Sequence, residues 1–237
     1  MGNNYFQFKK FRINQSDCAM KVTTDASLFG AWVAHYSSQC KKALDIGGGT
    51  GLLSLILAQK NETEIDIIEI EETCFGQMKE NIEQTEWKNR INCIAKDIRD
   101  YNPSFQYSLI ISNPPFHEGQ LKSDDASINL ARHGNDLTLE VLFKKVNELL
   151  TEEGDFYLLG PSYRDQETIS IASKNGFHLK NKVAVKQSVF HDPFRIMYAF
   201  SRKNHSEGLI KEIIIKDSKD QYTEDFIMYL KDYYLYM

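Results

Sequence analysis

The sequence lacks the patterns that mark a metal centre or a disulfide-rich scaffold. Its four cysteines, Cys18, Cys40, Cys74 and Cys93, stand far apart with no Cys-x-x-Cys pair. Its six histidines are equally scattered, without the His-Glu-x-x-His spacing of a zinc enzyme. We therefore predict no bound metal and no disulfide framework in a chain of 237 residues. A reduced, cytoplasmic setting is the simplest expectation.

Long apolar runs and targeting segments are also missing. The longest apolar stretch, at 52–58, is much shorter than the roughly 20 residues that cross a bilayer. The first residues show no basic region followed by an apolar run, so no secretory signal is expected. A composition of 42% hydrophobic and 26% charged residues is typical of a globular protein with a substantial core. We expect one domain over residues 1–237, with a core at 41–203 and a carboxyl-terminal extension at 204–237.

Positive charge is scarce but unevenly placed. The net charge is −5, which argues against a general nucleic-acid binder. Residues 178–203 nevertheless hold six basic residues against one acidic residue, and residues 1–24 hold four against one. Two basic segments on an acidic body could bind a phosphate backbone locally. The alternative is that they are solvated faces of ordinary strands and loops.

Apolar runs alternate with helical periodicity along most of the chain. This alternation predicts a mostly parallel, doubly wound sheet with helices on both faces. The helix near residue 28 has Thr24 or Asp25 available as its N-cap. The strands are expected at 42–46, 65–70, 91–95, 107–112, 156–159, 177–185 and 194–201, and the helices at 28–36, 52–58, 72–85, 137–150 and 168–174. A further β-like run at 213–215 and a tyrosine-rich helix form the tail.

The first predicted strand ends in a glycine-rich turn. Asp45 is followed by Gly47, Gly49 and Gly51, and glycine lets the backbone turn sharply and approach a ligand. The dinucleotide fingerprint Gly-x-Gly-x-x-Gly would place its third glycine at Leu52, so this spacing counts against NAD. The stretch resembles the Asp-x-Gly-x-Gly-x-Gly turn of S-adenosylmethionine-dependent methyltransferases. That resemblance implies S-adenosyl-L-methionine as the cofactor.

The next two predicted strands end in carboxylates. Glu69 can accept two hydrogen bonds from a ribose diol, although it could be an ordinary exposed acid at a strand end. Glu71 is a nearby rival, but Glu69 directly follows the apolar run. In the methyltransferase resemblance, Asp97 accepts a hydrogen bond from the amino group of the cofactor's adenine. The alternative for Asp97 is a turn residue that caps the following segment.

The fourth predicted strand runs into Asn113, Pro114, Pro115 and Phe116. Two prolines cannot continue a ladder, so the backbone leaves the sheet rigidly, with carbonyls free to accept a ligand's N–H. Taken alone this could be a plain strand exit. After the three upstream motifs, it resembles the Asn/Asp-Pro-Pro-aromatic signature of enzymes that methylate an NH2 group on a planar system. The resemblance implies that these four residues are catalytic and that Asn113 also lies against the cofactor.

A more specific resemblance covers nearly the whole chain. Residues 17–25 and 28–32, Glu86-Trp87, Ala131-Arg132-His133 and the tyrosine-rich tail are similar to the bacterial tRNA1(Val) (adenine-37-N6)-methyltransferase family. The family implies a Rossmann-like class I fold with a seven-stranded sheet. It also implies that residues 1–40 cover the cofactor. The cofactor-covering residues would be Lys21, Thr24 and Asp25.

The resemblance implies a tRNA substrate, without a membrane or metal partner, and we expect a monomer. Arg132 and His133 follow the Asn-Pro-Pro-Phe motif in a loop, so they are candidates for RNA contact, although such a loop is as readily held by its own hydrogen bonds. Lys186 and Arg195 in the second basic segment are further candidates. An unpaired anticodon-loop adenine suits the mechanism, because it can be splayed out at low cost.

Other functions remain open at this stage. Within the same class, the substrate could be an amino group of rRNA or a release-factor glutamine. The glutamine enzymes usually carry an additional helical domain, for which the 40 residues before the first strand leave no room. From a different class, the chain could be a cofactor-binding module without catalysis, but such a module has no need of the Asn-Pro-Pro-Phe motif. A dehydrogenase is disfavoured by the glycine spacing.

Overall fold

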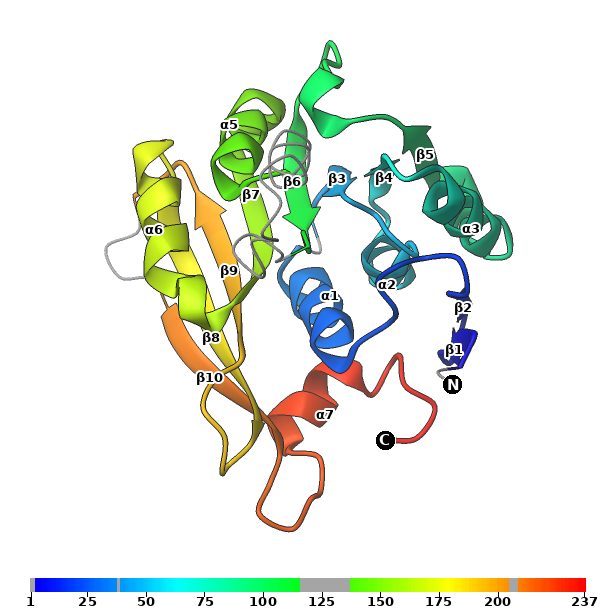
Figure 1. The fold of residues 1–237 in the computed structure, drawn as a ribbon, viewed down its shortest axis with the longest axis vertical. Helices are drawn as coiled ribbons and strands as arrows, with labels where there is room; N and C mark the ends of the chain where they lie inside the picture. Colours follow the sequence, from blue (N-terminus) through cyan, green and yellow to red (C-terminus); the bar gives the residue numbers. More distant parts are fainter. Residues whose placement is uncertain (1–2, 38, 116–136, 205–208) are drawn as a thin grey trace, which may run out of the picture.

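The computed structural model describes residues 3–37, 39–115, 137–204 and 209–237. In these ranges an eight-stranded sheet lies between helices on its two faces (Figure 1). Its spatial order is β10-β8-β9-β7-β6-β3-β4-β5. The strands are β3 (Lys42–Ile46), β4 (Glu64–Glu69), β5 (Ile91–Ala95), β6 (Tyr107–Ser112), β7 (Leu150–Pro161), β8 (His178–Ser188), β9 (Arg195–Ser201) and β10 (Leu209–Lys216).

The sheet is parallel except around β9, which runs antiparallel to both β7 and β8. The doubly wound, mostly parallel architecture predicted from the sequence is therefore confirmed. The predicted number of seven strands is wrong. The apolar run at 213–215 belongs to β10, which pairs in parallel with β8 and adds an eighth strand at that edge.

Helices cover the sheet because its central strands are apolar on both faces, as buried parallel strands are. Neighbouring residues point to opposite faces: Ala43 packs in one core cluster and Leu44 in the other. The first cluster lies under α1 (Thr24–Tyr36), α2 (Leu52–Lys60), α3 (Glu72–Glu83) and α7 (Glu224–Leu230), and the second under α5 (Leu139–Leu149) and α6 (Asp165–Lys174). Three short 3-10 turns complete the described elements: η1 (Lys88–Arg90), η2 (Ile98–Asp100) and η3 (Ser162–Arg164).

Helix ends largely follow the local sequence. Helix α6 ends at Lys174 with Asn175 as its C-cap, and Gly176 follows with a φ of +79°, as expected for an Asn-Gly stop. The N-cap of α1 differs from the expectation of Thr24 or Asp25. It is Thr23, whose hydroxyl accepts from the Ala26 N–H at 3.4 Å, so Thr24 and Asp25 lie in the first turn instead.

The amino-terminal segment is packed into the first core cluster. Strands β1 (Tyr5–Gln7) and β2 (Arg12–Asn14) form a small antiparallel sheet of their own. Phe8 is fully buried and forms an isolated β-bridge with Tyr234, and the Lys9 N–H donates to the Tyr233 carbonyl at 2.8 Å. The two ends of the described chain therefore lie close together, as Figure 1 also shows.

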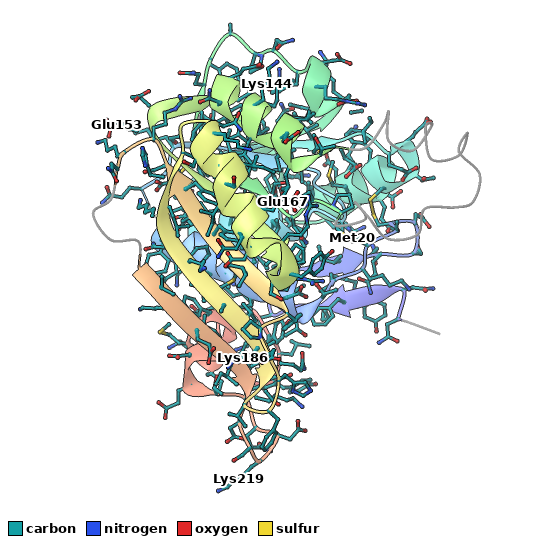
Figure 2. All side chains as sticks on the ribbon, turned by 60° about the vertical axis from the view of Figure 1, so that its left-hand side comes forward. Met20, Lys144, Glu153, Glu167, Lys186 and Lys219 are labelled. Carbon is teal, nitrogen blue, oxygen red and sulfur yellow. A yellow bond between two sulfur atoms is a disulfide. The ribbon has the colours of Figure 1, made fainter. Side chains whose placement is uncertain are left out.

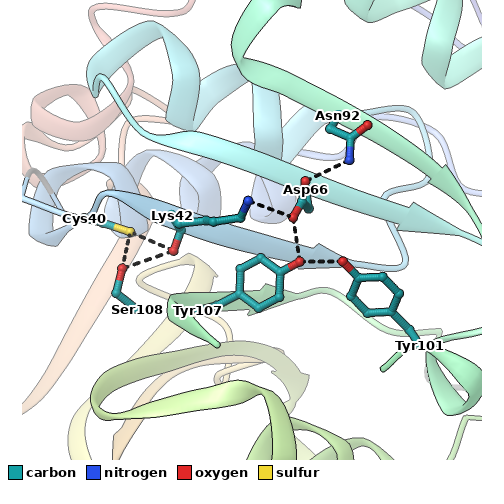
Figure 3. A network of polar contacts seen from close by, with 7 residues as sticks. All are labelled: Cys40, Lys42, Asp66, Asn92, Tyr101, Tyr107 and Ser108. Atoms are coloured by element: carbon teal, nitrogen blue, oxygen red, sulfur yellow. Dashed lines mark hydrogen bonds and ion pairs between the residues drawn. The ribbon is translucent and has the colours of Figure 1, made fainter. Parts of the chain in front are cut away.

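A polar network joins strands near the edge of the sheet where the central strands begin (Figure 3). Asp66 of β4 is buried and accepts from the Tyr107 hydroxyl at 2.6 Å and from the Asn92 amide at 2.9 Å. The Lys42 ammonium lies 3.5 Å from the same carboxylate, and the Tyr101 hydroxyl is 2.7 Å from that of Tyr107. The network thus connects β3, β4, β5 and β6 at one end.

The described residues contain neither a membrane-crossing helix nor a cluster of metal ligands. No helix there is long and apolar enough to cross a membrane. Within the same ranges, no group of three His, Cys, Asp or Glu side chains is placed to hold a metal ion.

Candidate functional site

The carboxyl ends of four adjacent strands meet around one cavity of about 310 Å³. The strand ends are level, because Ile46 of β3 pairs with Ser112 of β6 on one side and with Ile68 of β4 on the other. A parallel sheet is expected to bind ligands at this edge. The cavity is lined by residues that follow or end these strands, together with residues of the amino-terminal segment, among them Ala19, Met20, Gly47, Gly49, Glu69, Asp97, Asn113 and Pro115.

The glycine turn after β3 adopts the backbone conformation that the sequence predicted. Gly47, Gly49 and Gly51 have φ values of +74°, +55° and +84°, which other residues rarely adopt. Gly47 and Gly48 both donate to the Ile68 carbonyl, at 3.0 and 2.9 Å, so the turn is folded against β4. Gly47 and Gly49 line the cavity, whereas Gly51 lies outside that lining and begins α2 as its N-cap.

Glu69 lies at the cavity and is already extensively hydrogen-bonded. Its Oε2 accepts from the Gly49 N–H at 2.9 Å, and its Oε1 accepts from the N–H groups of Ile70 and Glu71, each at 2.9 Å. A carboxylate offers about four acceptor positions, so about one remains, on Oε2. Glu71, the rival candidate, caps α3 by accepting from Thr73 and Cys74, although it also lines the cavity.

Asp97 caps the following turn, as one of the two alternatives from the sequence expected, and it also lines the cavity. Its Oδ1 accepts from the Arg99 N–H at 2.9 Å, so it caps η2. Its side chain also forms an ion pair with the Arg99 guanidinium, whose hydrogen bonds hold the pKa of Asp97 below its usual value. Both residues line the cavity.

Asn113 presents an acceptor without a partner. Its Oδ1 is buried, and no donor in the described part of the chain reaches it. The strand end is fixed because the Ser112 hydroxyl donates to the Ile46 carbonyl at 2.9 Å. A buried unpaired acceptor typically costs about 1–3 kcal/mol, and here it belongs to a residue that lines the cavity. Pro114 is buried and Pro115 is exposed, and Phe116 lies outside the described residues.

Several predicted site residues lie elsewhere. Asp45 is buried behind the glycine turn, where its Oδ2 accepts from the Ser54 hydroxyl at 2.8 Å, and burial raises its pKa to about 7. Lys21 and Thr24 are exposed and are not among the lining residues. Asp25 is buried and pairs with the Arg195 guanidinium at 2.9 Å.

The structure also brings residues to the cavity that the sequence did not single out. Ala19 and Met20 come from the amino-terminal segment; Figure 2 labels Met20. They lie within the stretch expected to cover the cofactor, where the sequence pointed only to the polar residues Lys21, Thr24 and Asp25. Arg99 could have been found from its position two residues after Asp97, where a turn brings the side chains together.

The positive charges of the basic segment at 178–203 are neutralised by carboxylates of the same chain. Each of its six cations lies within ion-pair distance of a carboxylate elsewhere in the chain. Lys186 pairs with Glu212 at 3.0 Å, and it lies well away from Met20 in Figure 2. The other pairs are Lys180–Asp155, Lys182–Asp165, Arg195–Asp25, Arg202–Glu152 and Lys203–Glu153. Arg132 and His133, the remaining candidates for RNA contact, lie outside the described residues.

One cysteine prediction is wrong. Cys18 and Cys74 are joined by a disulfide, with their Cα atoms 4.6 Å apart, whereas Cys40 and Cys93 are free. The separation of 56 positions between the two partners hid the pairing in the sequence. They meet because the amino-terminal segment folds back across the start of α3.

Comparison with known proteins identifies the chain. Residues 30–169 match the methyltransferase small domain family. A tRNA1(Val) (adenine(37)-N6)-methyltransferase of Bacteroides thetaiotaomicron is 35% identical over 240 residues, covering all of both chains. A protein of the same name from Parabacteroides distasonis is also 35% identical, again over all of both chains. The chain belongs to the tRNA1(Val) (adenine(37)-N6)-methyltransferase family. The resemblance drawn from the sequence is thereby confirmed, and the chain is a methyltransferase.

Solved structures agree on the class I methyltransferase fold. A predicted O-methyltransferase of Agrobacterium tumefaciens is 15% identical with a TM-score of 0.65, covering 84% of this chain and 92% of its own. A glycopeptide N-methyltransferase, solved in complex with S-adenosylmethionine, is 9% identical with a TM-score of 0.53, covering 74% of this chain and 87% of its own. At these identities the likeness supports the fold alone.

Proposed function

We propose that this methyltransferase transfers a methyl group from S-adenosyl-L-methionine to N6 of an adenine in tRNA, and that the adenine is residue 37 of tRNA1(Val). The substrate follows from relatives of that name at 35% identity over the whole chain. The observation that carries the chemistry is the buried, unpartnered Oδ1 of Asn113 at the edge of the cavity. It is an acceptor in need of an N–H donor, and an adenine amino group supplies one.

Asn113 and Pro114 would orient the target nitrogen. An adenine amino group is a poor nucleophile because its lone pair is delocalised into the ring. If the Asn113 Oδ1 and the Pro114 carbonyl each accept one of its N–H groups, the lone pair is directed out of the ring plane. Both acceptors also stabilise the positive charge that develops on nitrogen, as preorganised dipoles do. No strong general base is required, because the methylated nitrogen loses its proton readily.

The cavity would hold the methyl donor, which supplies an electrophilic methyl group on a sulfonium. Gly47 and Gly49 have no Cβ and leave room for a ligand against the backbone. Because three of about four acceptor positions on Glu69 are used, we expect it to accept one ribose hydroxyl through Oε2 instead of two. Asp97 is a candidate acceptor for the adenine amino group of the cofactor, while it remains paired with Arg99.

The amino-terminal segment would complete the cofactor site. Residues 1–40 are proposed to cover the cofactor, with Ala19 and Met20 as apolar wall. Lys21 and Thr24 could join this wall only through a movement of the exposed segment that holds them. Asp45, Gly51 and Asp25 would support the site from behind, through Ser54, α2 and Arg195 respectively.

Basic and aromatic residues would recognise the RNA. Lys186 and Arg195 would bind phosphate only by sharing or leaving their partners, Glu212 and Asp25. Phe116 would stack on the target base, worth about 1–3 kcal/mol, and Arg132 and His133 would contact the loop beside it. We propose a monomer of one domain that acts in the cytoplasm, where tRNA is modified.

Methyl transfer to unmodified tRNA tests the proposal directly. Losing one preorganised acceptor costs about 2.7–4 kcal/mol, so Asn113→Ala should reduce the rate about 10²- to 10³-fold. Asn147→Ala, at an exposed position of α5 with no hydrogen bond from its side chain among the described residues, is the matched control. Mass spectrometry of the digested product locates the methyl group. Equal rates for both variants, or a methyl group on another atom, would contradict the proposal.

A further inference from the structure

One face of α3 fastens the amino-terminal segment through three successive contacts. Cys74, Gln77 and Asn81 are spaced three and four residues apart, so they lie on the same side of the helix, and all three are buried. Asn81 exchanges two hydrogen bonds with the backbone of Asn14, at 2.8 and 2.9 Å. Gln77 accepts from the Asp17 N–H at 3.1 Å and donates to the Ser16 hydroxyl at 2.9 Å.

The third contact is the Cys18–Cys74 disulfide, and it stands beside the cavity. Cys74 lines the cavity itself, and the two residues that follow Cys18 are Ala19 and Met20, which line it too. Ala19, Met20 and Lys21 make no hydrogen bond to the rest of the described chain. The disulfide is therefore the contact that holds this part of the cavity wall against α3.

This contact differs from the other two in chemistry. Hydrogen bonds through Gln77 and Asn81 are insensitive to redox conditions, whereas a disulfide is opened by reduction. When the disulfide is reduced, the remaining link is a weak contact from the Cys18 sulfur to the Cys74 carbonyl at 3.8 Å. Residues 14–17 would stay fixed by Asn81 and Gln77. The Val22 N–H would stay bonded to Gln15 Oε1 at 2.8 Å, so only the wall between these points would be released.

We infer that Cys18 and Cys74 form a redox-active thiol pair that controls how firmly the cavity wall at Ala19 and Met20 is held over the methyl donor. Closing the pair joins the two Sγ atoms with loss of two protons and two electrons. A small-molecule disulfide accepts them as it is reduced to two thiols, and the exchange is reversed by the same chemistry. The inference rests on the proposed use of the cavity for S-adenosylmethionine.

The oxidised form should release the methyl donor more slowly than the reduced form. Pinning a wall raises the free energy of its local opening, and such changes act mainly on dissociation rates. A ligand bound in the cavity should also protect the disulfide from reduction. Cys18 and Cys74 are only 5% and 7% exposed, and Cys74 lines the cavity that the ligand would fill.

The test uses the full-length protein without RNA. One sample is oxidised with oxidised dithiothreitol and another reduced with a phosphine, and both are desalted. Peptide mapping identifies the linked cysteines, and stopped-flow measurements give the release rate of S-adenosylhomocysteine. We expect a Cys18–Cys74 link and release about tenfold slower from the oxidised protein. S-adenosylhomocysteine present during reduction should slow the opening of the disulfide.

Variants separate this pair from the other cysteines. Cys18→Ser should abolish the difference between the two treatments, whereas the Cys40→Ser/Cys93→Ser double variant should retain it. Equal release rates from oxidised and reduced protein, or a Cys18–Cys74 link that does not form, would overturn the redox inference and leave the proposed function standing. Failure to bind S-adenosylhomocysteine in either state would overturn both.

Discussion

The glycines of the turn after β3 are required for two different physical reasons. Gly47, Gly49 and Gly51 are required by their backbone conformation, whereas Gly48 is required by packing. A Cβ at Gly48 would lie 2.3 Å from Cγ1 of Ile67 and 2.9 Å from the sulfur of Met78, both in the core. The turn therefore carries a fourth glycine because β4 and α3 approach it closely.

Substitution of Gly48 should consequently destabilise the fold. We expect Gly48→Ala to lower the free energy of unfolding by about 1–3 kcal/mol, as overpacking of a core does. Gly76→Ala is the matched control, because Gly76 lies within α3 with open space around it and alanine is the better helix former by about 1 kcal/mol. Urea unfolding measures both. Equal stability of the two variants would contradict the packing argument.

Asp45 should make stability depend on pH in a definite direction. Burial raises its pKa from 3.8 to about 7, so the folded chain keeps this proton to higher pH than the unfolded chain. The stability that Asp45 contributes is present below pH 3.8 and is lost as the pH rises to about 7. Asp45→Asn removes this loss. Relative to the parent, the free energy of unfolding of the variant should rise by about 1.4 kcal/mol per pH unit across that window. Above pH 7 the difference should stay constant.

Urea unfolding of both proteins at several pH values measures this difference. A suitable control is an asparagine that makes no contact with a buried carboxylate, unlike Asn92, which bonds to Asp66. Asn147→Ala, at an exposed position on α5, should keep the parent's pH dependence. A constant difference between Asp45→Asn and the parent from pH 4 to 7 would show that Asp45 does not hold a raised pKa.

The conformation of single residues was predictable where the local sequence determines it. The positive φ values at 47, 49 and 51 follow from the glycines themselves. The disulfide and the Asp25–Arg195 pair were not predictable, because each joins residues 56 or more positions apart. The roles assigned to Glu69, Asp97 and Asn113 stay predictions until the variants are measured.

At the scale of elements, the beginning of the central sheet is held by one buried carboxylate. Asp66 connects strands through Tyr107, Asn92 and Lys42, and its Tyr107 partner in turn meets Tyr101. Desolvation, followed by the hydrogen bond to Asp66, raises the pKa of Tyr107, so this phenol remains a donor. The network lies at the opposite ends of the strands from the cavity, so it can be altered without touching the site.

Removing the central hydroxyl should loosen this edge. Tyr107→Phe leaves the buried Asp66 oxygen without its shortest hydrogen bond, which should cost about 1–3 kcal/mol. Tyr101→Phe removes only the outer hydroxyl and should cost less. Thermal unfolding measures the order of the two effects, and the methylation rate of both variants should equal that of the parent. A larger loss for Tyr101→Phe would contradict this ranking.

The positions of the central strands and helices were predicted better than the number of strands in the sheet. Apolar runs and helical periodicity located the central strands and the flanking helices, because burial on both faces of the sheet leaves a continuous apolar signal. The edge strand β10 was harder to predict. In β10, charged residues Lys211 and Glu212 precede the apolar run, so the sequence showed a short β-like stretch but not the strand that pairs with β8.

At the scale of the whole molecule, charges of opposite sign are arranged in pairs instead of patches. All six cations of residues 178–203 face carboxylates, so a net charge of −5 is not offset by a large positive face there. Any phosphate contact through these residues has to compete with an internal ion pair.

Salt dependence of tRNA binding should reveal that competition. If Lys186 contacts phosphate, Lys186→Gln weakens binding and reduces the slope of log Kd against log salt by about 0.7, the value for one single-stranded phosphate. Glu212→Gln should strengthen binding, because it frees Lys186 from its partner. Lys144→Gln, on α5 well away from Lys186 in Figure 2, controls for the loss of one charge. Identical slopes for Lys186→Gln and Lys144→Gln would remove Lys186 from the RNA interface.

The bridge between Phe8 and Tyr234 bears on the order in which the protein is completed during synthesis. The segment that leads to the cavity wall is anchored on α3 at one point and on residues 233 and 234 at another. A ribosome delivers the second anchor only after nearly the whole described chain has emerged. A nascent chain can therefore build the central strands β3 to β6 early, yet its cavity wall gains full support only when translation is almost finished.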